Sequence, residues 1–235
     1  MKAVLMSIQP KWCELIANGK KTVEIRKTKP KPGTSFKVYI YCTKAKKFFT
    51  HGCIRDTLDD LYRLPNGEIK FGYSGELMCC GTDEYNEDNF LNGKVIGEFV
   101  CTWIQEYESE FVDDDCREAI ASIDRDEDGD ATGFFEWTNE SDIPYIKTDF
   151  FKKCCVGYED LKKYIGLGFV TFYGWHISNL VIYDEPKELS EFKKINQPCW
   201  YGEMGISKRD CHECKSKDCF IQRPPQSWCY VQEKE

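Results

Sequence analysis

The stretch SIQPKWCELIANGKKTVEIRK, residues 7–27, determines how the N-terminal part of this chain folds. Pro10 suits the first position of a helix, where its missing amide hydrogen costs nothing, and Gly19 suits the left-handed residue that follows a helix end. The apolar residues between these two recur at helical spacing. We therefore predict a short helix over residues 10–18, preceded by a strand over VLMSI, residues 4–8.

The next segment, TVEIRK at residues 22–27, alternates apolar and polar residues and predicts a strand. Val23 and Ile25 then face the interior. Glu24 and Arg26 share the opposite face, shortly after two adjacent lysines. A solvated surface hairpin tolerates such residues and a binding cleft requires them, so the pattern leaves both interpretations open.

The net charge is unevenly distributed along the chain. The 235 residues carry a formal net charge of −8, yet residues 1–50 hold twelve Lys or Arg against two Glu, a balance of +10. The remaining residues therefore carry −18. A basic region in an acidic protein indicates a local anion site, because the acidic whole would repel extended duplex DNA. Solvated lysines around Pro30 and Pro32, with no partner, explain the same charge.

The sequence has no feature of a membrane or secreted protein. No apolar run reaches the roughly 20 residues that span a bilayer, and the N-terminal MKAVLMSIQP lacks the apolar region and cleavage site of a secretory signal. Fourteen cysteines in such a chain do not predict a disulfide framework. We therefore expect a cytoplasmic protein with no membrane partner.

Further strands are predicted along the chain from period-two alternation. SFKVYIYCT at residues 35–43 and KVIGEFVCTWIQEY at residues 94–107 are both strong strands. FVTFYGWHISNLVIYDEP at residues 169–186 reads as two strands that are broken near Gly174.

The remaining segments supply helices and connections. DDDCREAIASI at residues 113–123 predicts a helix that begins with aspartates, and GYEDLKKYI at residues 157–165 predicts a short amphipathic helix. Residues 50–92 look irregular with room for a hairpin, and KELSEFKKINQP at residues 187–198 looks like a linker. Short strands with a few helices predict a small, partly closed barrel in the α+β class.

A cysteine cluster near the C-terminus predicts a metal site. Four thiolates that include a C-x2-C pair meet the needs of a closed, tetrahedral, structural zinc site. An iron–sulfur cluster could use the same thiolates, with His212 or Cys229 as a variant ligand, and a reduced, metal-free loop is the third interpretation. The candidate ligands are Cys199, Cys211, Cys214 and Cys219.

The acidic segment DRDEDGDATGFFE, residues 124–136, begins as an EF-hand calcium loop does, with Asp124, Asp126, Asp128 and Gly129. The twelfth position, which should hold a bidentate Glu, is Phe135, so a solvated acidic loop is the more common outcome. No nucleophile elbow, Walker loop or dinucleotide fingerprint occurs, and His176 between apolar residues predicts a partly buried, hydrogen-bonded histidine.

Residues 7–27 resemble the opening of the ASCH (activating signal cointegrator homology) family, which reads roughly G-x-K-x-x-E-x-R. The matching residues here are Gly19, Lys21, Glu24 and Arg26. YGWHISNLVIYDEPKELSEF and RPPQSWCYV resemble the last strand and the C-terminal end of a subgroup found in phage and bacterial genomes. The resemblance covers residues 1–106 and 150–235.

This resemblance implies an α+β fold with a small β-barrel like that of pseudouridine-synthase-and-archaeosine-transglycosylase (PUA) domains. It implies a barrel domain at residues 1–186, with an acidic insertion at about 107–149, and a C-terminal zinc-knuckle-like extension at residues 187–235. It also implies binding of RNA or a modified nucleotide in a cleft. We expect the cleft residues to be Lys20, Lys21, Glu24 and Arg26, with Trp12 or Trp175 as a stacking ring.

Two alternatives to simple binding stay open, and the first is hydrolysis, either of a small acylated nucleoside or, as the resemblance to ribonuclease members implies, of RNA. Small ASCH members that hydrolyse acylated cytidine use a lysine that matches Lys21, with a Thr where this chain has Glu24. Their further catalytic Glu would fall near KKCCVG, where this chain offers Cys154 and Cys155 instead. Two of the three catalytic positions therefore differ, which favours binding over hydrolysis. The other alternative is an accessory protein whose acidic insertion or cysteine cluster contacts protein partners.

Overall fold

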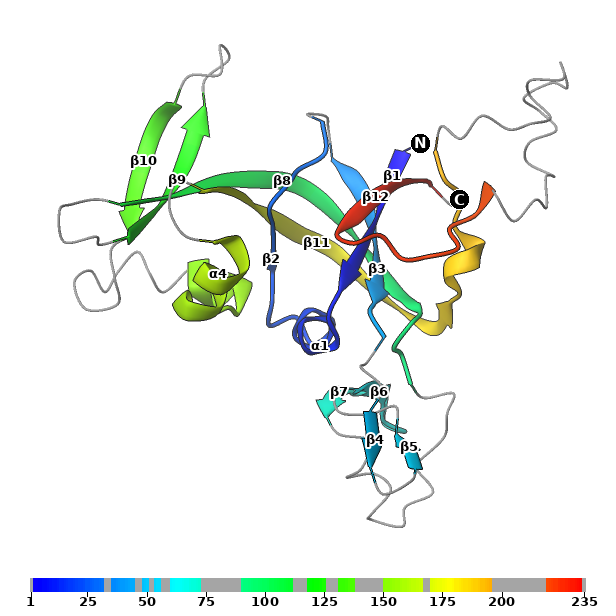
Figure 1. Cartoon of the computed structure of the whole chain (residues 1–235). Coiled ribbons are helices and arrows are strands. Elements are labelled where there is room, and N and C mark those ends of the chain that lie inside the picture. The colour runs from blue at the N-terminus through cyan, green and yellow to red at the C-terminus, as the bar shows by residue number, and fades with distance from the viewer. Residues whose placement is uncertain are drawn as a thin grey trace, which may run out of the picture. The chain divides into compact units, whose positions relative to one another are not determined.

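A computed structural model describes residues 2–31, 35–44, 48–50, 53–55, 60–72, 90–111, 118–125, 131–137, 150–166, 170–195 and 219–233 (Figure 1). The chain forms two compact units. Unit 1 comprises Met1–Asn18, Phe36–Val100 and Asn179–Glu235, and unit 2 comprises Gly19–Ser35 and Cys101–Ser178. Two long strands, β8 (Val95–Phe111) and β11 (Val170–Lys187), pair with each other. Each has one end in unit 1 and the other end in unit 2.

Unit 1 is built on strand β1 (Lys2–Ile8). β1 pairs in parallel with β3 (Phe36–Cys42) and antiparallel with β12 (Trp228–Gln232), so the two ends of the chain share one sheet. A strand that is covered on both faces does not alternate between buried and exposed residues. β3 shows this pattern, because its last five residues are all buried. The buried cluster contains Ala3, Leu5, Tyr39, Tyr41, Val95, Phe192, Ile221 and Val231.

The predicted first helix is confirmed as α1 (Pro10–Ala17), with proline in its first turn and Gly19 in the left-handed region at φ 70°. α1 packs against the hairpin of β6 (Asp60–Arg63) and β7 (Ile69–Gly72). A second hairpin joins β4 (Phe48–Thr50) to β5 (Cys53–Arg55). The segment that looked irregular in the sequence therefore contains two hairpins among its described residues.

Unit 2 contains strand β2 (Val23–Arg26), which pairs antiparallel with β11. The far end of β8 pairs with β9 (Glu118–Arg125), and β9 pairs with β10 (Ala131–Trp137). Residues 150–154 are helical, and α4 (Tyr158–Ile165) follows them, as the sequence predicted. The core contains Val23, Ile25, Tyr107, Ile120, Phe150, Cys154, Leu161, Ile165 and Phe172.

The helix predicted over residues 113–123 is wrong, because residues 118–123 belong to strand β9. β9 pairs on one side with β8 and on the other with β10, and this supplies backbone hydrogen bonds that outweigh the local helix preference. β9 and β10 also flank the candidate calcium loop, whereas an EF-hand loop joins two helices. Asp126, Asp128 and Gly129 lie outside the described residues.

The strand break predicted near Gly174 is also wrong, because β11 runs without interruption. A Cβ built on Gly174 would lie 2.9 Å from Cε2 of Tyr107 and 3.0 Å from Cγ1 of Val23. The glycine therefore permits close approach of a ring to the strand rather than a turn. The predicted linker at 187–198 begins with a 3₁₀ turn at Leu189–Glu191, closed by a capping box with Glu188, and its Phe192 is in the core of unit 1.

The α+β class is confirmed, but the described strands do not close into the predicted barrel. Their order is β10-β9-β8-β3-β1-β12, with β11 joined to β8 and β2, and the terminal strands β10 and β12 do not pair with each other. The domain boundary at residue 186 stays a prediction. None of the helices in the described part of the chain is long and apolar enough to cross a membrane.

We predict that Gly174→Ala lowers the free energy of unfolding by about 1–3 kcal/mol, because the added methyl group forces Tyr107 or Val23 to move within a packed core. Chemical denaturation with intact protein measures this. Gly157→Ala is the control and should lose less, because its Cβ would meet nothing within 4 Å. Equal stability of Gly174→Ala and the wild type would contradict the packing argument.

Candidate functional site

Three charged side chains meet in unit 2, on β2 and the turn before it. Nζ of Lys21 lies 3.3 Å from Oε2 of Glu24, and a terminal nitrogen of Arg26 lies 3.0 Å from Oε1 of the same carboxylate. These three residues are named the charged trio below. Their side chains are 1%, 7% and 8% exposed for Lys21, Glu24 and Arg26, so one buried carboxylate bridges two buried cations.

Strand pairing places the trio. Glu24 lies opposite Trp175 and Arg26 lies opposite Tyr173 in the β2–β11 register, so their side chains share one face of the sheet. The predicted alternation is present, but both faces of β2 are buried, because all four of its residues are covered. Trp175 has no exposed surface, so a ligand has no open face of its ring to stack on.

A segment far along the chain completes the site. The amine of Lys21 donates a hydrogen bond to the carbonyl oxygen of Cys154, and the amide of Thr22 donates to the carbonyl of Lys153 at 2.9 Å. Cys154 ends the helical residues 150–154, where carbonyl groups lack helical partners and a cation is favourable. Lys21 therefore ties β2 to the end of this helical segment.

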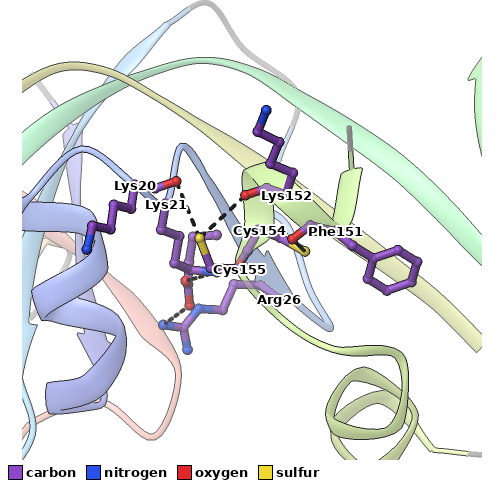
Figure 2. Close-up of polar contacts among 8 residues, drawn as sticks. Lys20, Lys21, Arg26, Phe151, Lys152, Cys154 and Cys155 are labelled. Carbon is purple, nitrogen blue, oxygen red and sulfur yellow. Dashed lines mark hydrogen bonds and ion pairs between the residues drawn. The ribbon is translucent and has the colours of Figure 1, made fainter. Parts of the chain in front are cut away.

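Cys155 makes a second link between the same segments (Figure 2). Its single thiol hydrogen is shared between the carbonyl oxygen of Lys20 at 3.3 Å and that of Lys152 at 3.4 Å. Cys155 adopts a left-handed backbone conformation with φ of 52°. Figure 2 shows the side chains of Lys20 and Lys152 extending away from this sulfur in different directions. The two lysines are therefore held at the same junction.

Cys154 is unsuited to act as a nucleophile. Burial raises the pKa of its thiol to about 11, and the charge of Lys21 opposes this only in part. Its thiol points to the carbonyl oxygen of Phe151 at 3.7 Å. At neutral pH it is a neutral, buried group that fills space.

Exposed lysines lie close to the trio in sequence, and further exposed lysines lie on the helical segment at residues 150–155. Lys29 is tied to Glu106 at 2.7 Å and lies over the ring of Tyr173, so it already has partners. Lys27 lies over the ring of Tyr164, 5.5 Å from its centroid. Burial raises the pKa of Tyr164, against the opposing effect of Arg26 beside it, so its phenol is neutral. The other exposed lysines in the described part of unit 2 are Lys20, Lys31, Lys152, Lys153 and Lys163, and of these Lys20, Lys152 and Lys153 lie on the two segments that Cys155 joins.

Not every predicted residue belongs to the described part of unit 2. Trp12 belongs to unit 1, where it lies under the amine of Lys11 at 4.3 Å. Of the four candidate metal ligands, Cys199, Cys211 and Cys214 lie outside the described residues, and Cys219 is half-buried. No group of three or more His, Cys, Asp or Glu that could hold a metal occurs in the described ranges.

Sequence reasoning missed the contribution of residues 150–155. The hydrogen bond from Lys21 to Cys154 joins positions 133 residues apart, and no periodicity or spacing in the sequence links them. The run KKCC was noted only as a departure from a catalytic pattern. The lysine-rich composition of residues 152–153 was the one signal that could have pointed to a shared basic surface.

Comparisons with known proteins identify one family. A family model described as "ASCH domain" matches residues 6–113, a range that includes α1, β2 and the charged trio. A comparison with curated proteins and one with solved structures found no match.

We predict that Glu24→Gln lowers the free energy of unfolding by about 3–5 kcal/mol, because it leaves Lys21 and Arg26 buried without their shared carboxylate. Urea denaturation followed by circular dichroism measures the loss. Glu68→Gln is the matched control: Glu68 pairs with Lys70 at 3.9 Å with both side chains about half exposed, so its loss should stay within about 0.5 kcal/mol. Equal losses in the two variants would show that the trio is not a structural clamp.

Proposed function

We propose that the protein binds single-stranded RNA or a nucleotide through the basic surface of unit 2, because residues 6–113 match the family model of the ASCH domain. The observation that carries the proposal is the junction at Cys155, which holds the backbones of Lys20 and Lys152 together beside the buried trio. ASCH domains are PUA-like, and this class suggests an RNA- or nucleotide-binding module.

The charges support a single-stranded or small ligand. Lys20, Lys27 and Lys152 are exposed on unit 2, and lysine ammonium groups are common partners of phosphate oxygens. The whole chain carries −8, which disfavours a long duplex that would extend over acidic surface. A short strand or a nucleotide needs only the local basic surface.

The charged trio has a supporting role in this proposal. Its side chains are nearly covered, so it contributes by fixing the turn at residues 19–22 against residues 150–155 rather than by a broad contact surface. Lysines on a rigid backbone lose less freedom when they engage phosphates than lysines on a mobile loop. Arg26 and Glu24 as direct ligand contacts stay a prediction.

The alternative is hydrolysis of an acylated nucleoside with Lys21 as the catalytic group. The amine of Lys21 contacts the Glu24 carboxylate and the Cys154 carbonyl in a buried position. A catalytic lysine must reach its substrate, so these contacts favour binding over hydrolysis. Release of acid from acylated cytidine by the purified protein, lost in Lys21→Met, would overturn this preference.

We predict that the protein binds a fluorescently labelled single-stranded RNA, and that the double variant Lys20→Ala/Lys152→Ala binds it more weakly at every sequence tested. Each lost phosphate contact should reduce the slope of log affinity against log salt by about 0.7, so the double variant should lose about 1.4. Fluorescence anisotropy over a salt series measures both values.

The control for this experiment is Lys44→Ala/Lys70→Ala, which removes two exposed lysines of unit 1 and changes net charge equally. If binding depends on the Cys155 junction, the control keeps most of the salt slope. If both double variants lose the same amount of RNA affinity, the loss comes from net charge alone and the junction has no special role. No RNA or nucleotide binding by the wild type at low salt would end the proposal.

We also propose that Cys199, Cys211, Cys214 and Cys219 hold one structural zinc ion. Four thiolates that include a C-x2-C pair suit zinc, which takes four soft ligands in a closed tetrahedral site. We predict about one zinc per chain by elemental analysis of protein purified without chelators, and a loss of zinc in Cys214→Ser but not in Cys229→Ser. Iron, or no metal, would contradict the zinc assignment.

A further inference from the structure

We propose that the outer face of Trp103 is a stacking site for one base of a bound single-stranded RNA. This inference rests on the proposed function, because it names a second contact of the same ligand on unit 2. Nothing in the ASCH motif itself points to Trp103, which lies on β8, far in sequence from the turn at residues 19–22.

Trp103 is an exposed indole that is already stacked on one side. Its side chain belongs to a residue that is 54% exposed, the most exposed large hydrophobic residue in the described part of the chain. The ring of His176 on β11 lies 4.4 Å from the Trp103 ring, centroid to centroid, at an interplanar angle of 23°. One face of the indole is therefore covered by a parallel ring, and the residue as a whole stays open to solvent.

The exposure of Trp103 is unusual for its place in the sheet. Strand alternation puts it on the same face of β8 as Cys101, Gln105 and Tyr107, and all three of these are buried. Tyr107 is covered by Phe150, whose ring centroid is 4.7 Å away. The helical cover therefore reaches Tyr107, whereas the indole of Trp103 keeps apolar surface in water, at a cost that a ligand could recover.

His176 stacks against the indole as a neutral ring. Burial lowers the pKa of His176, and the nearby charge of Lys153 lowers it further, so the imidazole is neutral at pH 7. Two neutral rings stack face to face without the hydration that a charged imidazolium would require. A base that adds to this stack meets a preformed surface and pays little to order it.

The chemistry around the indole favours a nucleobase over an apolar protein partner. Tyr164 is the only other large hydrophobic residue that is exposed in the described part of unit 2, so Trp103 is an isolated ring rather than part of a hydrophobic patch. Exposed Lys153 is on a neighbouring segment: the amide of Thr22 donates to the carbonyl of Lys153, and the amide of Ile177, next to His176, donates to the carbonyl of Thr22. A ring for stacking beside a cation for phosphate is the combination that single-stranded nucleic acid uses.

The test compares Trp103→Leu, Trp103→Phe and wild type for binding to a labelled single-stranded RNA of about 12 nucleotides and to an abasic oligomer of the same length. Trp103→Leu keeps an apolar side chain but removes the ring, and it should bind the RNA about tenfold more weakly. Trp103→Phe keeps a ring and should recover part of this loss. The abasic oligomer should bind wild type and Trp103→Leu equally, because it has nothing to stack.

The outcomes separate this inference from the proposed function. If wild type binds RNA and loses affinity in Lys20→Ala/Lys152→Ala, but Trp103→Leu binds as wild type does, the stacking site is overturned and the proposed function stands. If wild type binds neither oligomer, both are overturned. Should Trp103→Leu fail to fold, as judged by circular dichroism, wild type alone decides: equal affinity for the RNA and the abasic oligomer overturns the stacking site.

Discussion

The charged trio of unit 2 depends on the double ion pair of Glu24. Its single carboxylate balances part of the positive charge of Lys21 and Arg26 at a place that little water reaches. Taking three charged groups out of water costs several kcal/mol for each, and only close pairing offsets that cost. The pairing fixes the positions of the turn and the strand together. It also explains how a motif full of charged residues can occupy a buried strand.

The same constraint draws two distant segments together. Lys21 reaches the carbonyl of Cys154, and Cys155 reaches back to the carbonyl of Lys20, so residues 20–22 and 150–155 are linked in both directions. The exposed lysines of both segments are thereby set on a common rigid base. The buried charges at this place hold the two segments together, and the exposed charges that face solvent come from both segments.

Local patterns predicted the local structure well. Pro10 and Gly19 bracket α1, and the alternation in residues 23–26 orders the side chains of β2. The failures share one cause, which is that pairing partners far along the chain decided the outcome. β9 is a strand because β8 and β10 flank it, and Gly174 serves the ring of Tyr107 rather than a turn. The sequence predicted a site of four charged residues in one motif with a tryptophan for stacking, and no local rule links this motif to the carbonyl of Cys154.

The burial of the trio changes how its motif should be interpreted. Charged residues on the polar face of a strand suggested contacts with a ligand, but side chains that are at most 8% exposed have most of their hydrogen-bonding capacity turned inward. In the proposed function, recognition therefore belongs to groups that face solvent, and those include the lysines of the junction and the indole of Trp103. Phosphates and bases are separate chemical targets, and these two kinds of side chain match them separately. A single-stranded ligand offers both targets at once, whereas a duplex conceals its bases within the stack.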